Sequence, residues 1–199
     1  MVTRVQTVAF QGIQALPVDV QVQVANGMPA FNIVGLPDKA VGESKERVRS
    51  ALTSSGLSLP PKRITINLAP ADLPKEGSHY DLPIALGLMA AIGAIPSDSL
   101  DEYVVLGELA LDGRISPVAG TLPAAVSAEG RQLGLICPAD CGPEAAWAGE
   151  DLNIIAPVNL LALVNHLPGN QLCARPVARR RDQTASFPDR SAIKGQECA

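Results

Sequence analysis

The chain has few aromatic residues and no long apolar run. Phe, Trp and Tyr make up 3% of its 199 residues, whereas apolar residues of all kinds make up 47%. A core must therefore be built from Val, Ile, Leu and Ala. A membrane-spanning helix needs about 20 consecutive apolar residues, so no span is expected. The opening MVTRVQTVAF lacks the apolar segment and cleavage site of a signal peptide. We expect a cytoplasmic protein with no membrane partner.

Patterns for metal binding are also missing. The four cysteines are Cys137, Cys141, Cys173 and Cys198. A C-x3-C pair with His166 well downstream does not have the ligand spacing that is usual for zinc. We expect these thiols to be buried or incidental, and we expect no metal site.

A third absence concerns ATP. The chain has no G-x4-G-K-[ST] loop to cradle phosphates, and no apolar strand that ends in paired acidic residues. Near its end, Gly195 is followed by Gln196 and Glu197 where such a loop would need Lys and Ser or Thr. We therefore expect no cofactor in this chain and no ATP hydrolysis by it alone.

Charge is distributed unevenly along the chain. The formal net charge is −4, but residues 171–199 hold six Lys/Arg and three Asp/Glu. An acidic body is a poor nucleic-acid surface by itself. The run Arg179-Arg180-Arg181 lies in a Pro- and Ser-containing segment that is typical of a solvated linker. If the chain contacts nucleic acid, the candidates are Lys75, Arg175 and these three arginines.

The first part of the chain is dominated by strand patterns. Residues 5–10 and 17–25 are expected to be strands, the second because valines alternate with polar residues from Val18 to Val24. Asn26-Gly27 is a hairpin signal, and residues 29–36 would form the return strand. These three segments predict an antiparallel meander.

Helical patterns follow. Residues 36–57 have one apolar face, with Asp38 as a candidate N-cap. An alternating strand over 63–70 and a loop over 71–80 come next. Residues 82–93 are apolar on nearly every side, so this helix should be buried, with Asp81 as its cap.

The second part alternates strands and helices. Asp112-Gly113 is a hairpin signal between the strands on either side of it. Antiparallel strands early and interleaved helices later predict an α+β class, a two-layer α/β domain over residues 1–168. The remaining elements are expected at 103–106, 109–111, 115–118, 122–132, 133–138, 142–148, 152–157 and 158–167.

Several blocks occur in an order that is more specific than any one motif. They are VDVQVQVANG, FNIVGLPDKAV, PKEGSHYDLPIALGL, VLGELALDGRISPVAG and GLICP. Over residues 1–168 the chain resembles the N-terminal domain of the YifB/ComM family of magnesium-chelatase-like AAA+ ATPases. The resemblance implies a ribosomal-protein-S5-domain-2-like fold, which is related to the proteolytic domain of Lon.

Lon-type proteases carry a Ser–Lys dyad, and the resemblance allows its positions to be compared. The serine position falls on His79, with Ser78 one residue early, and the lysine position falls on Leu122. A serine without a base is a weak nucleophile. A Lon-like hydrolase in which His79 activates Ser78 is an alternative, although adjacent side chains in an extended loop point to opposite sides.

A structural role is the main expectation for this loop. Ser78 and His79 would satisfy backbone groups, while Lys75 and Glu76 would be solvated. A second functional alternative is that the loop contacts a neighbouring subunit or nucleic acid.

The stretch from Glu108 to Arg114 is expected to be a strand and turn of the fold. Glu108 is a candidate interior charge that must be paired, with backbone groups or Arg114 as donors. Asp112, Gly113 and Arg114 would form the turn.

The resemblance also extends to the end of the chain. Residues 169–191 are expected to be a basic flexible linker, and IKGQECA within 192–199 is similar to the segment that opens the AAA+ domain in this family. The chain is thus expected to be a fragment without its motor. By resemblance, the intact protein would be a hexamer that uses ATP and Mg for DNA branch migration in natural transformation. Partners would be its own AAA+ domain, neighbouring subunits and, as a further candidate, DNA. A magnesium-chelatase subunit is a weaker alternative, because chelatase motors begin with the ATPase module.

Overall fold

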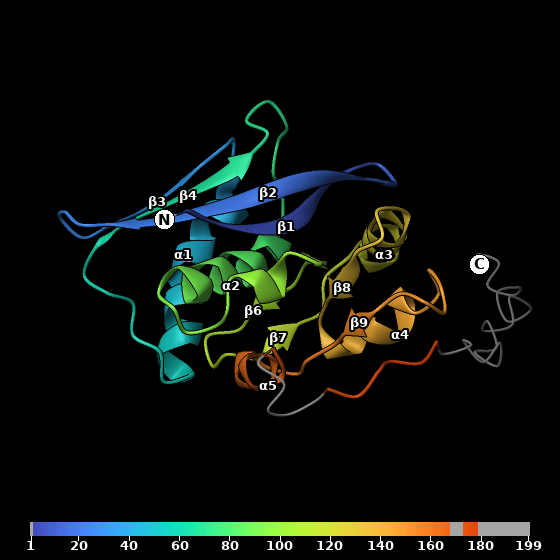
Figure 1. The fold of residues 1–199 in the computed structure, drawn as a ribbon. Helices are drawn as coiled ribbons and strands as arrows, with labels where there is room; N and C mark the ends of the chain where they lie inside the picture. The colour runs from blue at the N-terminus through green and yellow to red at the C-terminus, as the bar shows by residue number, and fades with distance from the viewer. Residues whose placement is uncertain (1, 168–172, 179–199) are drawn as a thin grey trace, which may run out of the picture.

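The computed structural model describes residues 2–167 and 173–178, and its centre is a seven-stranded sheet (Figure 1). The strand order is β3-β4-β2-β1-β5-β8-β9. The pairs β1–β2 and β2–β4 are antiparallel, and the other four pairs are parallel. The strands are β1 (Val2–Gln11), β2 (Gln14–Ala25), β3 (Ala30–Val34), β4 (Arg63–Ala69), β5 (Tyr103–Val105), β8 (Gly134–Ile136) and β9 (Ile154–Ile155).

The expected meander is wrong at its third strand. β3 pairs with β4 in parallel, from Ala30 opposite Arg63 to Val34 opposite Asn67, and it does not pair with β2. β4 lies between them, because all seven of its residues pair with β2. The chain reaches β4 through helix α1 (Lys39–Ser54), so β3, α1 and β4 form a parallel crossover. Asn26-Gly27 therefore begins a connection and not a hairpin.

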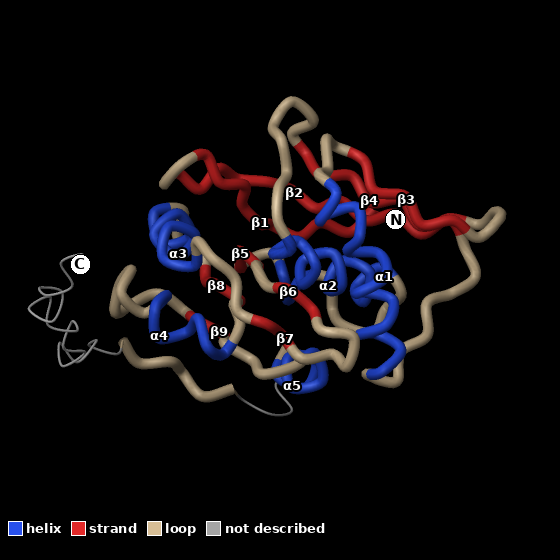
Figure 2. Tube along the Cα trace, turned by 180° about the vertical axis from the view of Figure 1, so that it is seen from behind, coloured by secondary structure: helices blue, strands red, loops and turns tan. Residues whose placement is uncertain are grey.

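Helices lie on both faces of the sheet (Figure 2). Neighbouring strand residues point to opposite sides, so Val105, Ile136 and Ile155 pack in one apolar cluster and Val104, Leu135 and Ile154 in a second. The first cluster includes residues of α1, α2 (Asp81–Ala91) and α5 (Leu160–His166). The second includes residues of α3 (Thr121–Gly130) and α4 (Gly142–Ala145). The α+β class expected from the sequence is confirmed.

Helix α2 is the buried helix that its composition predicts. Every residue from Asp81 to Met89 is buried. A Cβ at Gly87 would lie 2.7 Å from a methyl of Val22, so the absence of a side chain lets the helix approach the sheet closely. This packing places the first turn of α2 deep in the domain.

The hairpin predicted at Asp112-Gly113 is confirmed. β6 (Glu108–Leu109) and β7 (Ile115–Ser116) pair in antiparallel orientation outside the main sheet. Three short 3-10 helices, Ser78–Tyr80, Asp98–Leu100 and Ala139–Cys141, complete the elements of the described part. Within residues 2–167 and 173–178, no helix has both the length and the apolar character to cross a bilayer.

Candidate functional site

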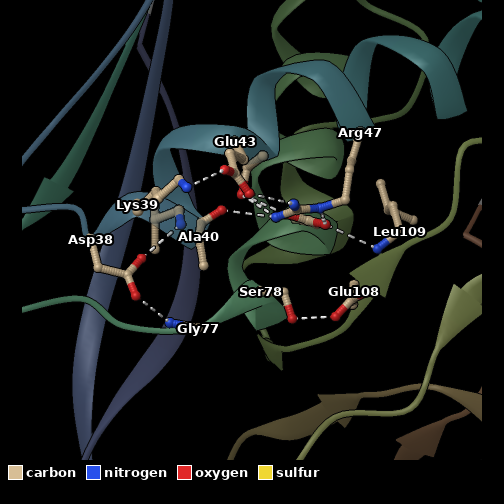
Figure 3. Close-up of polar contacts among 12 residues, drawn as sticks. Asp38, Lys39, Ala40, Glu43, Arg47, Gly77, Ser78, Glu108 and Leu109 are labelled. Carbon is tan, nitrogen blue, oxygen red and sulfur yellow. Dashed lines mark hydrogen bonds and ion pairs between the residues drawn. The ribbon is translucent and has the colours of Figure 1, made fainter.

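The loop that precedes α2 is fastened to the beginning of α1 (Figure 3). The Oδ1 atom of Asp38 accepts from the backbone N–H of Val41 at 2.7 Å, which confirms Asp38 as the N-cap. Its Oδ2 atom accepts from the N–H of Gly77 at 3.1 Å. The N–H of Asp38 also donates to the carbonyl of Lys75 at 2.9 Å. One carboxylate thus caps a helix and holds the loop.

Lys75 lies inside this loop, and the expectation that it is solvated is wrong. Its side chain has 0% exposure, and its Nζ donates to the carbonyl oxygen of Pro70. Burial lowers the pKa of Lys75, because the charged form loses its hydration. A buried ammonium has no surface to offer a phosphate, so the structure does not support Lys75 as a nucleic-acid contact.

Ser78 is paired with an acid and not with a base. Its Oγ donates to Oε2 of Glu108, and Glu108 belongs to β6 (Figure 3). Among the described residues the donor to Glu108 is thus Ser78, whereas backbone groups or Arg114 were expected; the Arg114 Nε donates to Asp112 at 2.7 Å. A carboxylate is far too weak a base to deprotonate a serine hydroxyl, so this contact does not activate Ser78 as a nucleophile.

His79 is turned away from Ser78 and into the core. It is 5% exposed, and its Nε2 lies 2.8 Å from the carbonyl oxygen of Val8. Because a carbonyl can only accept, Nε2 carries the proton of the neutral ring. The ring lies beside Phe10 and Tyr80, with centroids 5.2 and 4.1 Å away. Ser78 and His79 therefore do not form the hydrogen-bonded pair that the hydrolase alternative requires.

The buried ring should make stability depend on pH. Burial lowers the pKa of His79 below its ordinary value of about 6.5, which the unfolded chain retains. As the pH falls below about 6.5, the unfolded chain binds a proton that the folded chain rejects, so the free energy of unfolding decreases by up to about 1.4 kcal/mol per pH unit until the folded pKa is reached. We expect His79→Gln, which cannot titrate, to lose less stability over that range.

Urea unfolding of both proteins between pH 7.5 and 5 measures this effect. All other titrating groups are shared, so the difference in unfolding free energy between the two proteins isolates His79. A difference that does not change with pH would contradict the assignment.

Asp81 was expected to cap α2, and this is wrong. It is the first residue of the helix, and its carboxylate accepts hydrogen bonds from α1 and β6. Oδ1 accepts from Ser44 Oγ, and Oδ2 accepts from Arg47 Nε at 2.6 Å and from the N–H of Leu109 at 3.1 Å. Arg47 also donates to the carbonyl of Ala40 at 2.9 Å. The buried carboxylate of Asp81 therefore links α2 to α1 and to the β6–β7 hairpin.

The contact between Asp81 and Arg47 favours the charged form of each residue. Burial raises the pKa of Asp81, and the hydrogen bonds from Arg47 and Ser44 oppose that rise. The same contact raises the pKa of Arg47. Since both carboxylate oxygens face donors, the ionised pair is the form that this geometry fits. Ser44 and Arg47 were not identified from the sequence as partners of Asp81. A signal was present at Ser44, because it occupies a core-facing position of α1 where a polar side chain needs a partner.

The turn from Asp112 to Arg114 contacts two helices. Oδ1 of Asp112 accepts from the N–H of Arg114 at 3.1 Å. The carbonyl of Gly113 accepts from the N–H of Leu160 at the start of α5, and a Cβ on Gly113 would lie 2.9 Å from Ser55 Oγ. These contacts give the turn a packing role.

The remaining candidates are remote from this junction. Arg175 is exposed, and one of its Nη atoms donates to the carbonyls of Glu150 and Leu152. Arg179, Arg180, Arg181 and Cys198 lie outside the described residues.

No group of three or more His, Cys, Asp or Glu side chains in the described part could hold a metal ion. Cys137 and Cys141 are free and buried in the second cluster, and burial raises the pKa of the Cys137 thiol. The Cys137 thiol is therefore a poor nucleophile at neutral pH.

The sequence of the chain matches a known protein family and several curated proteins. Residues 20–140 match the family described as subunit ChlI of Mg-chelatase. The chain is 41% identical over 193 residues to the protein YifB of Escherichia coli, which covers 97% of this chain and 38% of YifB. It is 42% identical over 185 residues to competence protein ComM of Haemophilus influenzae, which covers 93% of this chain and 36% of ComM.

A weaker match agrees with the fold. Lon protease 2 of Bacillus subtilis is 27% identical over 122 residues, 54% of this chain and 22% of the protease. The chain spans 38% of the length of YifB, so most of each such relative lies outside the match.

Proposed function

The chain belongs to the YifB/ComM family of magnesium-chelatase-like proteins and corresponds to their N-terminal region, and we propose that it is the non-catalytic accessory domain of a ComM-like AAA+ ATPase. In this proposal the domain helps to assemble a ring of subunits. A separate ATPase module, which binds ATP and Mg, supplies the energy.

One observation carries the proposal. Nearly the whole chain, 93%, matches ComM, yet the match covers only 36% of ComM. The remaining length is where an ATPase module would lie. The YifB and ComM matches also extend over more of the chain than the ChlI match at residues 20–140, which favours a ComM-like role over chelation.

The geometry of the loop before α2 supports an accessory role. The groups that could do chemistry are occupied, since Ser78 donates to Glu108 and His79 bonds to Val8. In the intact protein, the proposed activity is ATP-driven branch migration of DNA during natural transformation.

A chimera tests the proposal. Residues 1–168 of this chain would replace the matching region of Haemophilus influenzae ComM, and ComM without that region would be the control. We expect the chimera to form ATP-dependent hexamers, measured by mass photometry, and to move a synthetic four-way DNA junction. The 199-residue chain alone should hydrolyse no ATP.

The deletion control decides the outcome. A chimera that assembles no better than ComM without the region would show that the domain does not support the ring. ATP hydrolysis by the isolated chain would contradict its accessory role.

A further inference from the structure

Helix α1 has basic residues on two flanks, and the two flanks differ in whether those residues pair with a buried carboxylate. Its apolar side faces the core at Val41, Val48 and Leu52. On one flank, Arg47 is neutralised by Asp81. On the other, Lys45 and Arg49 stand one turn apart and are exposed. The second flank thus presents two exposed cations to solvent.

This flank forms one wall of a groove of ≈ 620 Å³. Strand β3 and the loop from Ser58 to Lys62 complete its walls. Phe31 and Ile64 are paired neighbours on β3 and β4, so both point to the helix side of the sheet and contribute apolar surface. Lys62 adds a third cation at the rim.

The groove is basic although the chain is acidic. Its lining holds Lys45, Arg49 and Lys62 against one acidic residue, Glu46, whereas the whole chain has a net charge of −4. Lys45 lies 3.9 Å from Glu46. Among the described residues, Arg49 and Lys62 have no carboxylate oxygen within 4.0 Å. Two cations at least are therefore available to an external anion.

We propose that this groove binds the sugar-phosphate backbone of single-stranded nucleic acid. Cations spaced along a rim with an aromatic ring on the apolar floor are the combination that binds single strands without reading sequence. The rim cations contact phosphates, and the half-buried ring of Phe31 gives a base a surface to pack on. The inference rests on the proposed function, because it assigns the DNA contact of such a machine to this domain.

Fluorescence anisotropy with a labelled oligothymidylate and the 199-residue chain tests the groove. Each lost phosphate contact should weaken binding about fivefold at 0.1 M salt, from a slope of about −0.7 per contact on single strands. The variant Lys45→Ala/Arg49→Ala/Lys62→Ala should bind about 100-fold more weakly, and its plot of log affinity against log salt should be flatter by about 2.

Lys39→Ala is the matched control, because Lys39 is an exposed lysine of α1 that does not line the groove. It should bind like the original chain. All four positions are on the surface, so equal thermal unfolding curves confirm that the variants fold.

Three results would overturn the proposal. They are no binding by the original chain, equal binding by the triple variant, and displacement of the oligonucleotide by an equal charge of polyglutamate, which would identify an acidic peptide as the occupant. None of these results affects ring assembly by the chimera, and loss of assembly by the chimera would not alter the groove measurement. The two failures are therefore distinguishable.

Discussion

Asp81→Ala is expected to lower the free energy of unfolding by about 3–5 kcal/mol, the range typical of breaking a buried ion pair from one side. The substitution leaves the Arg47 guanidinium, whose side chain is 21% exposed, without its carboxylate. It also leaves the buried N–H of Leu109 without an acceptor, which by itself costs about 1–3 kcal/mol. The losses share one partner, so they will not add fully.

Urea unfolding at pH 7 measures this change, and Asp112→Ala is the matched control. Asp112 also accepts from an arginine, at 2.7 Å, but its side chain is 55% exposed. An ion pair in solvent contributes little to stability, so the control should change little. If the two variants lost similar stability, the junction at Asp81 would not have the role assigned to it.

Gly35→Ala is expected to destabilise the domain by about 3 kcal/mol or more, since forced backbone conformations alone cost about 1–3 kcal/mol. Gly35 has a φ of 104°, which side chains rarely adopt, and a Cβ there would lie 2.1 Å from the carbonyl oxygen of Leu68. Because the obstacle is backbone of β4, it cannot rotate away. The strand pair β3–β4 would have to separate.

Gly42→Ala provides a control of opposite sign. Gly42 lies in α1 with nothing within 4 Å of its Cβ position, so alanine should raise stability by up to about 1 kcal/mol through helix propensity. Thermal unfolding of both variants gives the comparison. A Gly35→Ala protein as stable as the original would show that the chain passes β4 less closely than described.

The sequence predicted the elements that depend on local features and missed the contacts between distant residues. Apolar periodicity, apolar composition and an Asp-Gly turn signal are local features of the chain, and they predicted α1, α2 and the hairpin at Asp112-Gly113. The partner of a strand or a carboxylate depends on residues far away. Asp81 has the sequence features of a cap, yet its partner Arg47 comes from a helix 34 residues earlier.

The same reason explains Lys75 and β3. A lysine in a Pro- and Gly-containing loop has no local feature that predicts burial, because the atoms that cover it come from elsewhere in the fold. An Asn-Gly pair after a strand favours a hairpin, and only the competing pairing of β4 with β2 excludes it.

The position of β4 between β2 and β3 also constrains the order in which the chain can assemble. Pairing Val20 with Leu68 closes a loop that contains β3 and the whole of α1, and the entropy lost in closing a loop grows with its length. A preformed α1 shortens the flexible part of that loop. We therefore expect substitutions that weaken α1 to slow formation of the β2–β4 strand pair.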